Sequence, residues 1–280
     1  MNETRRMRPL LGTFVEVCAR GGDATQAAVD AAFASIQRAH SLWSFQDPDS
    51  ELSRLNAAPG LAMAVQADTL RLLRIAKALM QLSDGHFDCT VGGMLVQAGA
   101  LPDHGGPPAL PRGCLDDIEL RGHEVRLRRP VRITLDGLAK GYAVDLAIRA
   151  LKRQGARAGW VNAGGDLRAF GDLTLPLQRR ELDGRFTPLG GLREAAMASS
   201  RGTASLSADE DFPACIVAPD GQQTPIGIWT VLARSAWRAD ALTKVAATAP
   251  AAQRDALVRR LGGQLLAPQP VPMAQEEVPA

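Results

Sequence analysis

Hydrophobic and polar positions along the chain follow two periods, and each period predicts its own elements. Apolar and polar residues alternate over residues 11–17, which predicts a first strand. Helical spacing of apolar residues predicts helices over 24–42, from Asp68 to a stop at Gly85, over 239–248 and over 251–261. Asp23 and Asp68 precede the first two of these helices and are predicted as N-caps.

Further strands are expected between these helices. A hairpin over 118–120 and 125–127 turns at Gly122, and more strands are predicted over 159–163, 167–170, 214–218 and 228–234. Residues 44–53 and 99–113 are rich in polar residues, Gly or Pro and are predicted as loops. Strands and helices mix without strict alternation, which favours an α+β fold. We expect one domain over residues 1–266 and a flexible Pro-rich tail over 267–280.

The stretch from Thr134 to Asp145 carries the clearest chemical signal. A β-branched run over 131–134 leads through a turn at Gly137 into a predicted helix with Lys140 in its first turn. Helix N-termini present backbone N–H groups and the positive end of the dipole, and a lysine there favours a phosphate further. A second glycine turn follows over 161–166. Together these turns predict a ligand that carries phosphate.

Composition and charge exclude several classes. The chain is 46% hydrophobic and 22% charged, with a net charge of +2, which is typical of a globular protein. It has no basic stripe with interleaved aromatic residues, so a nucleic-acid-binding surface is not expected. Its four cysteines lie far apart without a CxxC pair, so buried free thiols are expected instead of a zinc site. There is no apolar signal core and no run of eighteen apolar residues, so we expect a cytoplasmic protein without a transmembrane segment.

Six segments occur in the order found in one known family. They are Leu11-Gly12-Thr13, the run from Asp49 to Asn56, Asp84-Gly85-His86-Phe87-Asp88, the run from Gly137 to Asp145, Asn162-Ala163-Gly164-Gly165-Asp166, and Ala239-Asp240-Ala241-Leu242. The chain thereby resembles the ApbE family of FAD:protein FMN transferases. The resemblance implies a T-fold-related α+β fold of two intertwined halves, with a nucleotide cleft between them.

The resemblance also implies an activity. The family cuts FAD at its pyrophosphate, transfers FMN to a Thr or Ser hydroxyl of a target protein and releases AMP, with help from Mg²⁺. Lys140 and Asp240 would be the catalytic residues, and the backbone carbonyl of Gly137, Asp240 and the Thr243 hydroxyl would hold the metal. The flavin nucleotide would be bound by Leu11, Gln46, His86, Phe87, Asp88, Thr134, Lys140 and Ile216.

This chain departs from the family pattern at several positions. Members usually have Asp where this chain has Thr134, and Ser then Thr where it has Thr243 then Lys244. The family's His-Ile-Ile-Asp-Pro segment is Cys-Ile-Val-Ala-Pro over 215–219, so its histidine and aspartate are absent and no general base is evident. A lysine beside a dication is repelled by it, and Lys244 could instead replace part of the metal's charge.

Other interpretations stay open at this point. Asp240 is as consistent with a helix N-cap as with a metal ligand, and Lys140 could be a surface lysine. Asp166 could simply bond to local backbone. The substitutions allow a catalytically impaired FAD-binding or scaffold protein of the same fold. A third possibility is an FAD pyrophosphatase that gives FMN and AMP.

Overall fold

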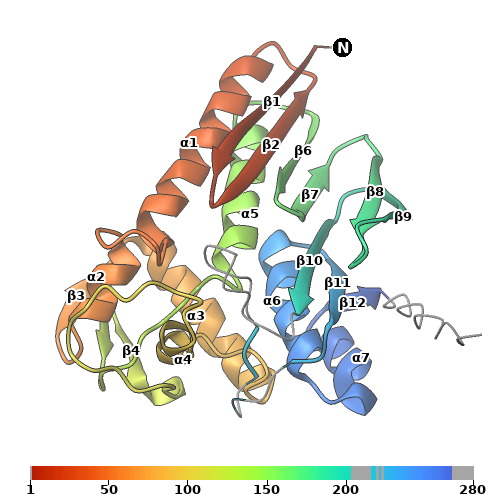
Figure 1. The fold of residues 1–280 in the computed structure, drawn as a ribbon. Coiled ribbons are helices and arrows are strands. Elements are labelled where there is room, and N and C mark those ends of the chain that lie inside the picture. Colours follow the sequence, from red (N-terminus) through yellow and green to blue (C-terminus); the bar gives the residue numbers. More distant parts are fainter. Residues whose placement is uncertain (1, 203–215, 219–220, 222–223, 267–280) are drawn as a thin grey trace, which may run out of the picture.

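The computed structural model describes residues 2–202, 216–218, 221 and 224–266, and its mixture of helices and antiparallel strands confirms the α+β class (Figure 1). The predicted tail over 267–280 and the first two residues of the predicted strand over 214–218 lie outside these residues. Within the described part of the chain, no helix is long and apolar enough to cross a membrane.

Seven antiparallel strands form the main sheet, in the order β1-β2-β6-β7-β10-β11-β12. Their bounds are β1 (Glu3–Leu10), β2 (Thr13–Arg20), β6 (Ala158–Ala163), β7 (Asp166–Phe170), β10 (Ala196–Gly202), β11 (Gly227–Ala233) and β12 (Gly263–Leu266). A hairpin of β8 (Leu175–Arg180) and β9 (Phe186–Leu192) and a small sheet of β3 (Ala62–Ala64), β5 (Glu124–Leu127) and β4 (Ile118–Arg121) stand apart from it.

Seven α-helices are present among the described residues. They are α1 (Thr25–Trp43), α2 (Glu51–Ala57), α3 (Ala67–Leu82), α4 (Gly92–Gln97), α5 (Ala139–Arg153), α6 (Ala236–Thr248) and α7 (Ala251–Arg260), with a short 3₁₀ turn over Leu115–Asp117. α1 and α5 lie side by side across the main sheet, and α5 also packs on α6 (Figure 1).

Strand alternation divides the residues of the main sheet between two layers. Val15, Val17 and Val161 pack with α1, α5 and α6 on one face. On the other face, Trp160 and Leu167 belong to a separate cluster with the β8–β9 hairpin. Because successive side chains of a strand point to opposite faces, every second residue of β7 and β10 faces the helices. This alternation decides which polar side chains reach the site described below.

The N-termini of α5 and α6 are held together by two carboxylates. Asp145 of α5 accepts the N–H groups of Ala236 (3.1 Å) and Trp237 (3.0 Å) in the first turn of α6. Asp240 of α6 accepts the N–H of Gly141 (3.1 Å) in the first turn of α5. A Cβ on Gly141 would lie 2.4 Å from the Ala236 carbonyl oxygen, so only glycine permits this approach.

Several expectations from the sequence are wrong in detail. The predicted first strand begins in a tight turn at Leu11 and Gly12, which have positive φ values, and β1 before it was not predicted. α1 and α3 have Ala24 and Gln66 at their N-caps instead of Asp23 and Asp68, and neither makes a side-chain capping bond. Asp240 lies in the second turn of α6, which begins at Ala236, so it is not that helix's cap.

The segment over 131–134 belongs to no helix or sheet, and Thr134 donates its N–H to the Cys89 carbonyl (2.9 Å). Part of the predicted loop over 44–53 is the start of α2. Cys18 and Cys89 are buried free thiols as predicted, whereas Cys114 is exposed. The fourth cysteine, Cys215, lies outside the described residues.

Candidate nucleotide site

One cavity of about 410 Å³ gathers most of the residues that the sequence assigned to a nucleotide. It opens between the turn before α5, the loops around residue 90, the end of β10 and α6. Eight predicted residues line it: Gln46, His86, Phe87, Asp88, Thr134, Gly137, Lys140 and Ile216. Residues that lie up to 170 positions apart in sequence therefore form one concave surface of a size typical of ligand sites.

A second cavity of about 420 Å³ adjoins the first. Leu11 lines this second cavity, together with Gly12 from the β1–β2 turn. Gln46, Asp136 and Lys140 line both cavities, so the two are parts of one depression with Lys140 at their boundary. Leu11 was predicted to contact the same nucleotide as the other residues, and its place on the adjoining cavity is consistent with a long ligand.

Lys140 is paired with Asp166 across the α5–β7 contact. The two charged atoms, Lys140 Nζ and Asp166 Oδ2, lie 3.3 Å apart, and the Asp166 carboxylate is almost wholly buried. Asp166 and Arg168 face α5 because they alternate along β7 with Leu167, which faces away. Asp166 was expected to bond to local backbone, whereas its described partner is this lysine.

The charges of this pair are shifted by their surroundings. Burial, reinforced by the nearby Asp240 carboxylate, raises the pKa of Asp166 above its ordinary value. The negative charge of Asp166 raises the pKa of Lys140, which therefore stays protonated at neutral pH. A lysine held charged at the edge of a cavity can bind a phosphate by charge-assisted hydrogen bonds.

A second lysine, Lys244 of α6, also lines the cavity and is bonded into a closed network. Its ammonium forms an ion pair with Asp240 Oδ1 one turn earlier and donates to Ser200 Oγ of β10 at 3.0 Å. Thr243 Oγ1 donates to the Asp240 carbonyl at 2.7 Å, so its other contact must be as acceptor from Ser200, at 2.7 Å. Every hydrogen of these two hydroxyls is thereby used within the protein.

The proposed magnesium ligands do not fit a metal ion as they stand. Asp240 and Thr243 are fully buried, and both Asp240 oxygens are occupied, one by Lys244 and one by the Gly141 N–H. The Lys244 side chain also runs beside Gly137, where a Cβ would lie 3.4 Å from Lys244 Cε. Among the described residues, no three His, Cys, Asp or Glu side chains are grouped so as to hold a metal.

Two other predicted residues have partners that fix their orientation. Asp88 accepts from Thr90 with Oδ1 (2.8 and 2.6 Å) and from Arg112 Nε with Oδ2 (2.6 Å), so its carboxylate is committed to the loop. Thr134 Oγ1 donates to Asp136 Oδ2 at 3.1 Å, which orders the turn before α5. Asp88 and Thr134 thus shape the wall of the cavity.

The glycine turn between β6 and β7 forms another part of this wall. Gly164 lines the cavity with a positive φ of 61°, and a Cβ there would lie 2.6 Å from Thr13 Oγ1. Both the conformation and the space therefore require glycine. Asn162 Oδ1 accepts the Gly165 N–H (3.0 Å) and stabilises the turn.

The polar residues of the cavity that were not among the predicted site residues include Asp136, Ser199, Ser200, Arg201, Lys244 and Thr248. Asp136 lies inside the Thr134–Asp145 motif, and its place before Gly137 was a usable signal. Lys244 is four residues after Asp240, the spacing at which helical ion pairs form. Ser200 and Arg201 lie on β10, which the sequence did not predict.

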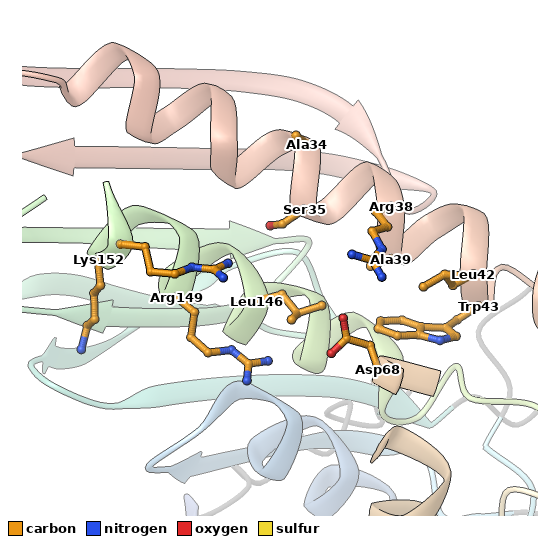
Figure 2. A pocket seen from close by; sticks show the side chains of 11 residues that line it. Ala34, Ser35, Arg38, Ala39, Leu42, Trp43, Asp68, Leu146, Arg149 and Lys152 are labelled. Carbon is orange, nitrogen blue, oxygen red and sulfur yellow. The ribbon is translucent and has the colours of Figure 1, made fainter. Parts of the chain in front are cut away.

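Another cavity of the described structure lies elsewhere. A groove of about 630 Å³ between α1 and α5 is lined by Arg38, Trp43, Asp68 and Arg149, among others (Figure 2). None of the predicted site residues lines it. Size therefore does not identify the candidate site, whereas the clustering of motif residues does.

Comparisons with known proteins agree with this fold. A sequence model of the ApbE family matches residues 11–267. The FAD:protein FMN transferase of Rhodobacter capsulatus is 32% identical over 180 residues, which are 58% of this chain and 34% of that protein. The chain thus aligns with about a third of the length of this curated relative.

Solved structures resemble the chain over most of its length. The ApbE protein of Thermotoga maritima has a TM-score of 0.80 at 23% identity, covering 94% of this chain and 93% of its own. The flavinyl transferase ApbE of Pseudomonas stutzeri, in its apo form, has a TM-score of 0.76 at 22% identity, covering 92% and 88%. These likenesses confirm the predicted fold.

Proposed function

The chain belongs to the ApbE family, and we propose that it transfers the FMN moiety of FAD to a Thr or Ser hydroxyl of a target protein, releasing AMP. The supporting observation is the cavity itself, where eight predicted residues, Lys140 among them, meet beside a second lysine, Lys244. A curated relative is named for this activity. The partner that the proposal requires is a protein that presents a hydroxyl to this cavity.

The chemistry is a displacement at phosphorus. The hydroxyl oxygen of the target would attack the phosphorus of the FMN moiety, and the pyrophosphate bond would break with its electron pair leaving on AMP. The hydroxyl proton is released in the same exchange. The protein's contribution to such a reaction is mainly to position the groups and to stabilise the charge on the phosphate oxygens.

We assign the following roles within this proposal. Lys140 lies at the boundary of the two cavities, where it would contact the pyrophosphate of a nucleotide that spans them. Phe87 would offer an apolar wall to the flavin ring, with His86 and Ile216 beside it. Asp240 does not reach the cavity surface, so it would act through Lys244 as a positioning residue instead of touching substrate.

Magnesium, which the resemblance implies, is not part of this proposal. Its expected ligands Asp240 and Thr243 are bonded within the protein, and no step is assigned to a metal.

The test is an incubation of the protein with FAD and a flavin-accepting protein domain. We expect a covalently fluorescent acceptor, an acceptor mass increased by one FMN moiety, and an equal amount of AMP. The Lys140→Ala variant should lose the signal, whereas Lys152→Ala, which changes an exposed residue at the other end of α5, should retain it. AMP formed equally well without acceptor would indicate a pyrophosphatase. FAD binding with neither AMP nor labelled acceptor would indicate a scaffold protein.

A further inference from the structure

We propose that the ammonium of Lys244 is the built-in cation of this site and takes the place of a divalent metal ion, so that FAD binds without one. This inference rests on the proposed function, because it concerns how the same cavity holds the pyrophosphate. It starts from the disagreement between the expected metal ligands and the bonds that they make.

The first step is position. Gly137 and Asp240 were expected to bind the metal, and the Lys244 side chain packs beside the first and is paired with the second. Its carbon chain passes the Gly137 Cα, and its nitrogen is bonded to Asp240 Oδ1. The ammonium therefore occupies an Asp240 oxygen that a metal bound by these two residues would need. Mg²⁺ requires oxygen ligands at about 2.0–2.1 Å in octahedral geometry, which this ammonium prevents.

The second step is bonding. Lys244 donates to Asp240 and to Ser200, and an ammonium has three hydrogens. The third is left for a group in the cavity, which Lys244 lines. The Ser200 hydroxyl donates to Thr243 Oγ1, which donates to the Asp240 carbonyl. The lysine is therefore held by neighbours whose own hydroxyl hydrogens are already used. Fixed side chains lose little entropy when a ligand binds, and this favours binding of an anion.

The third step is charge. Four carboxylates lie at or behind the cavity, those of Asp88, Asp136, Asp166 and Asp240. Asp88 is paired with Arg112, and Lys140, Lys244 and Arg201 balance the other three, so the cavity presents no net negative charge to a phosphate group. Without Lys244 this balance would be negative, and a cation would have to be recruited before a pyrophosphate could bind.

The fourth step is the choice of residue. Only four of the 32 basic residues in the chain are lysines, and two of these four line this one cavity. A lysine ammonium is a compact, strongly hydrated point charge, whereas a guanidinium is a broad planar fork. Of the two, the ammonium is the closer substitute for a small metal ion. An otherwise arginine-rich chain thus carries lysine where a point charge is useful.

Two measurements test the inference. The first needs no flavin: Mn²⁺, as a spectroscopic probe for Mg²⁺, is titrated into the protein and free Mn²⁺ is followed by electron paramagnetic resonance. We expect no stoichiometric Mn²⁺ site in the wild type. In Lys244→Thr, which removes the ammonium and supplies a hydroxyl, we expect one site per chain. A stoichiometric Mn²⁺ site in the wild type would overturn the inference.

The second measurement is FAD binding, followed by quenching of flavin fluorescence in Mg²⁺ or in EDTA. The wild type should bind equally well in both, within about twofold. Lys244→Thr should lose about tenfold or more in EDTA, the effect of one charge-assisted hydrogen bond, and recover with Mg²⁺. Lys152→Ala should behave as the wild type. Wild-type binding that requires Mg²⁺ would overturn the inference but leave the proposed function standing. Absence of FAD binding under both conditions would overturn the two together.

Discussion

The bond network between the N-termini of α5 and α6 gives a prediction whose size can be worked from the structure. Asp145 is buried and accepts two N–H groups from the first turn of α6, and it is also paired with Arg168. The Asp145→Ala variant removes all three contacts at once. It leaves two helix N–H groups without their acceptor and one guanidinium without its counter-ion.

The cost of Asp145→Ala has two parts. Loss of a helix N-terminal acceptor destabilises a protein by about 1 kcal/mol. Loss of one partner of a buried ion pair costs about 3–5 kcal/mol, but the Arg168 side chain is 25% exposed and can be partly rehydrated, so we take the lower half of that range or less. We therefore expect a loss of about 2–4 kcal/mol in the free energy of unfolding. Asp145→Asn keeps one acceptor oxygen and should lose about half as much.

Urea denaturation followed by tryptophan fluorescence measures this loss, provided that the m-value is unchanged. The control is Asp172→Ala, which removes a pair in which the Asp172 side chain is 95% exposed and should not move the midpoint. The affinity for FAD should also fall at temperatures well below unfolding, because the same contacts hold together the two helices that carry Lys140 and Lys244. A loss below about 1 kcal/mol for Asp145→Ala would refute the view that this network holds the two helices.

Three further predictions concern the site and the thiols. Lys140→Ala should raise the dissociation constant for FAD about tenfold in a binding titration, since it removes a charge-assisted contact, and an unchanged constant would remove Lys140 from the site. Burial raises the pKa of Asp166 from 3.8 to about 6, so the native state binds a proton that the unfolded chain has released. The free energy of unfolding should then fall as pH rises from about 4 to about 6, by at most about 1.4 kcal/mol per unit, and Asp166→Asn should flatten this fall. In native protein at pH 8, a thiol reagent should modify the exposed Cys114 before the buried Cys18, whose pKa burial raises to about 11, as peptide mass mapping would show.

Long periodic elements were predictable from the sequence, and short or exposed ones were not. α1 and α7 were predicted within one or two residues, because each keeps helical spacing over several turns. β1 was missed because most of its residues are exposed, which removes the alternation that marks a half-buried strand. The start of α2 was predicted as a loop, although a serine at position 50 is a recognisable N-cap residue. In the structure Ser50 Oγ accepts the Ser53 N–H at 3.0 Å.

The site was predictable as a set of residues but not as a set of bonds. The resemblance assigned His86, Thr134 and Lys140 to one site without any knowledge of the sheet, and all three line one cavity. The partner of Lys140 depends on which face of β7 Asp166 occupies, and that follows from register. Ser200 belongs to β10, whose pairing with β7 and β11 no local pattern predicted.

Asp145 and Asp240 make the same kind of contact between α5 and α6 but differ in their relation to the site. Each carboxylate accepts N–H from the first turn of the other's helix, so the pair is nearly symmetrical in its effect on the fold. They differ in the cation that neutralises them. Asp145 is paired with Arg168, which does not line either of the two adjoining cavities, and Asp240 with Lys244, which lines the one described first. The reciprocal hydrogen bonds explain why a carboxylate is buried in each of the two helices where they meet. The cation paired with each carboxylate, Arg168 or Lys244, distinguishes the structural carboxylate from the one beside the ligand cavity.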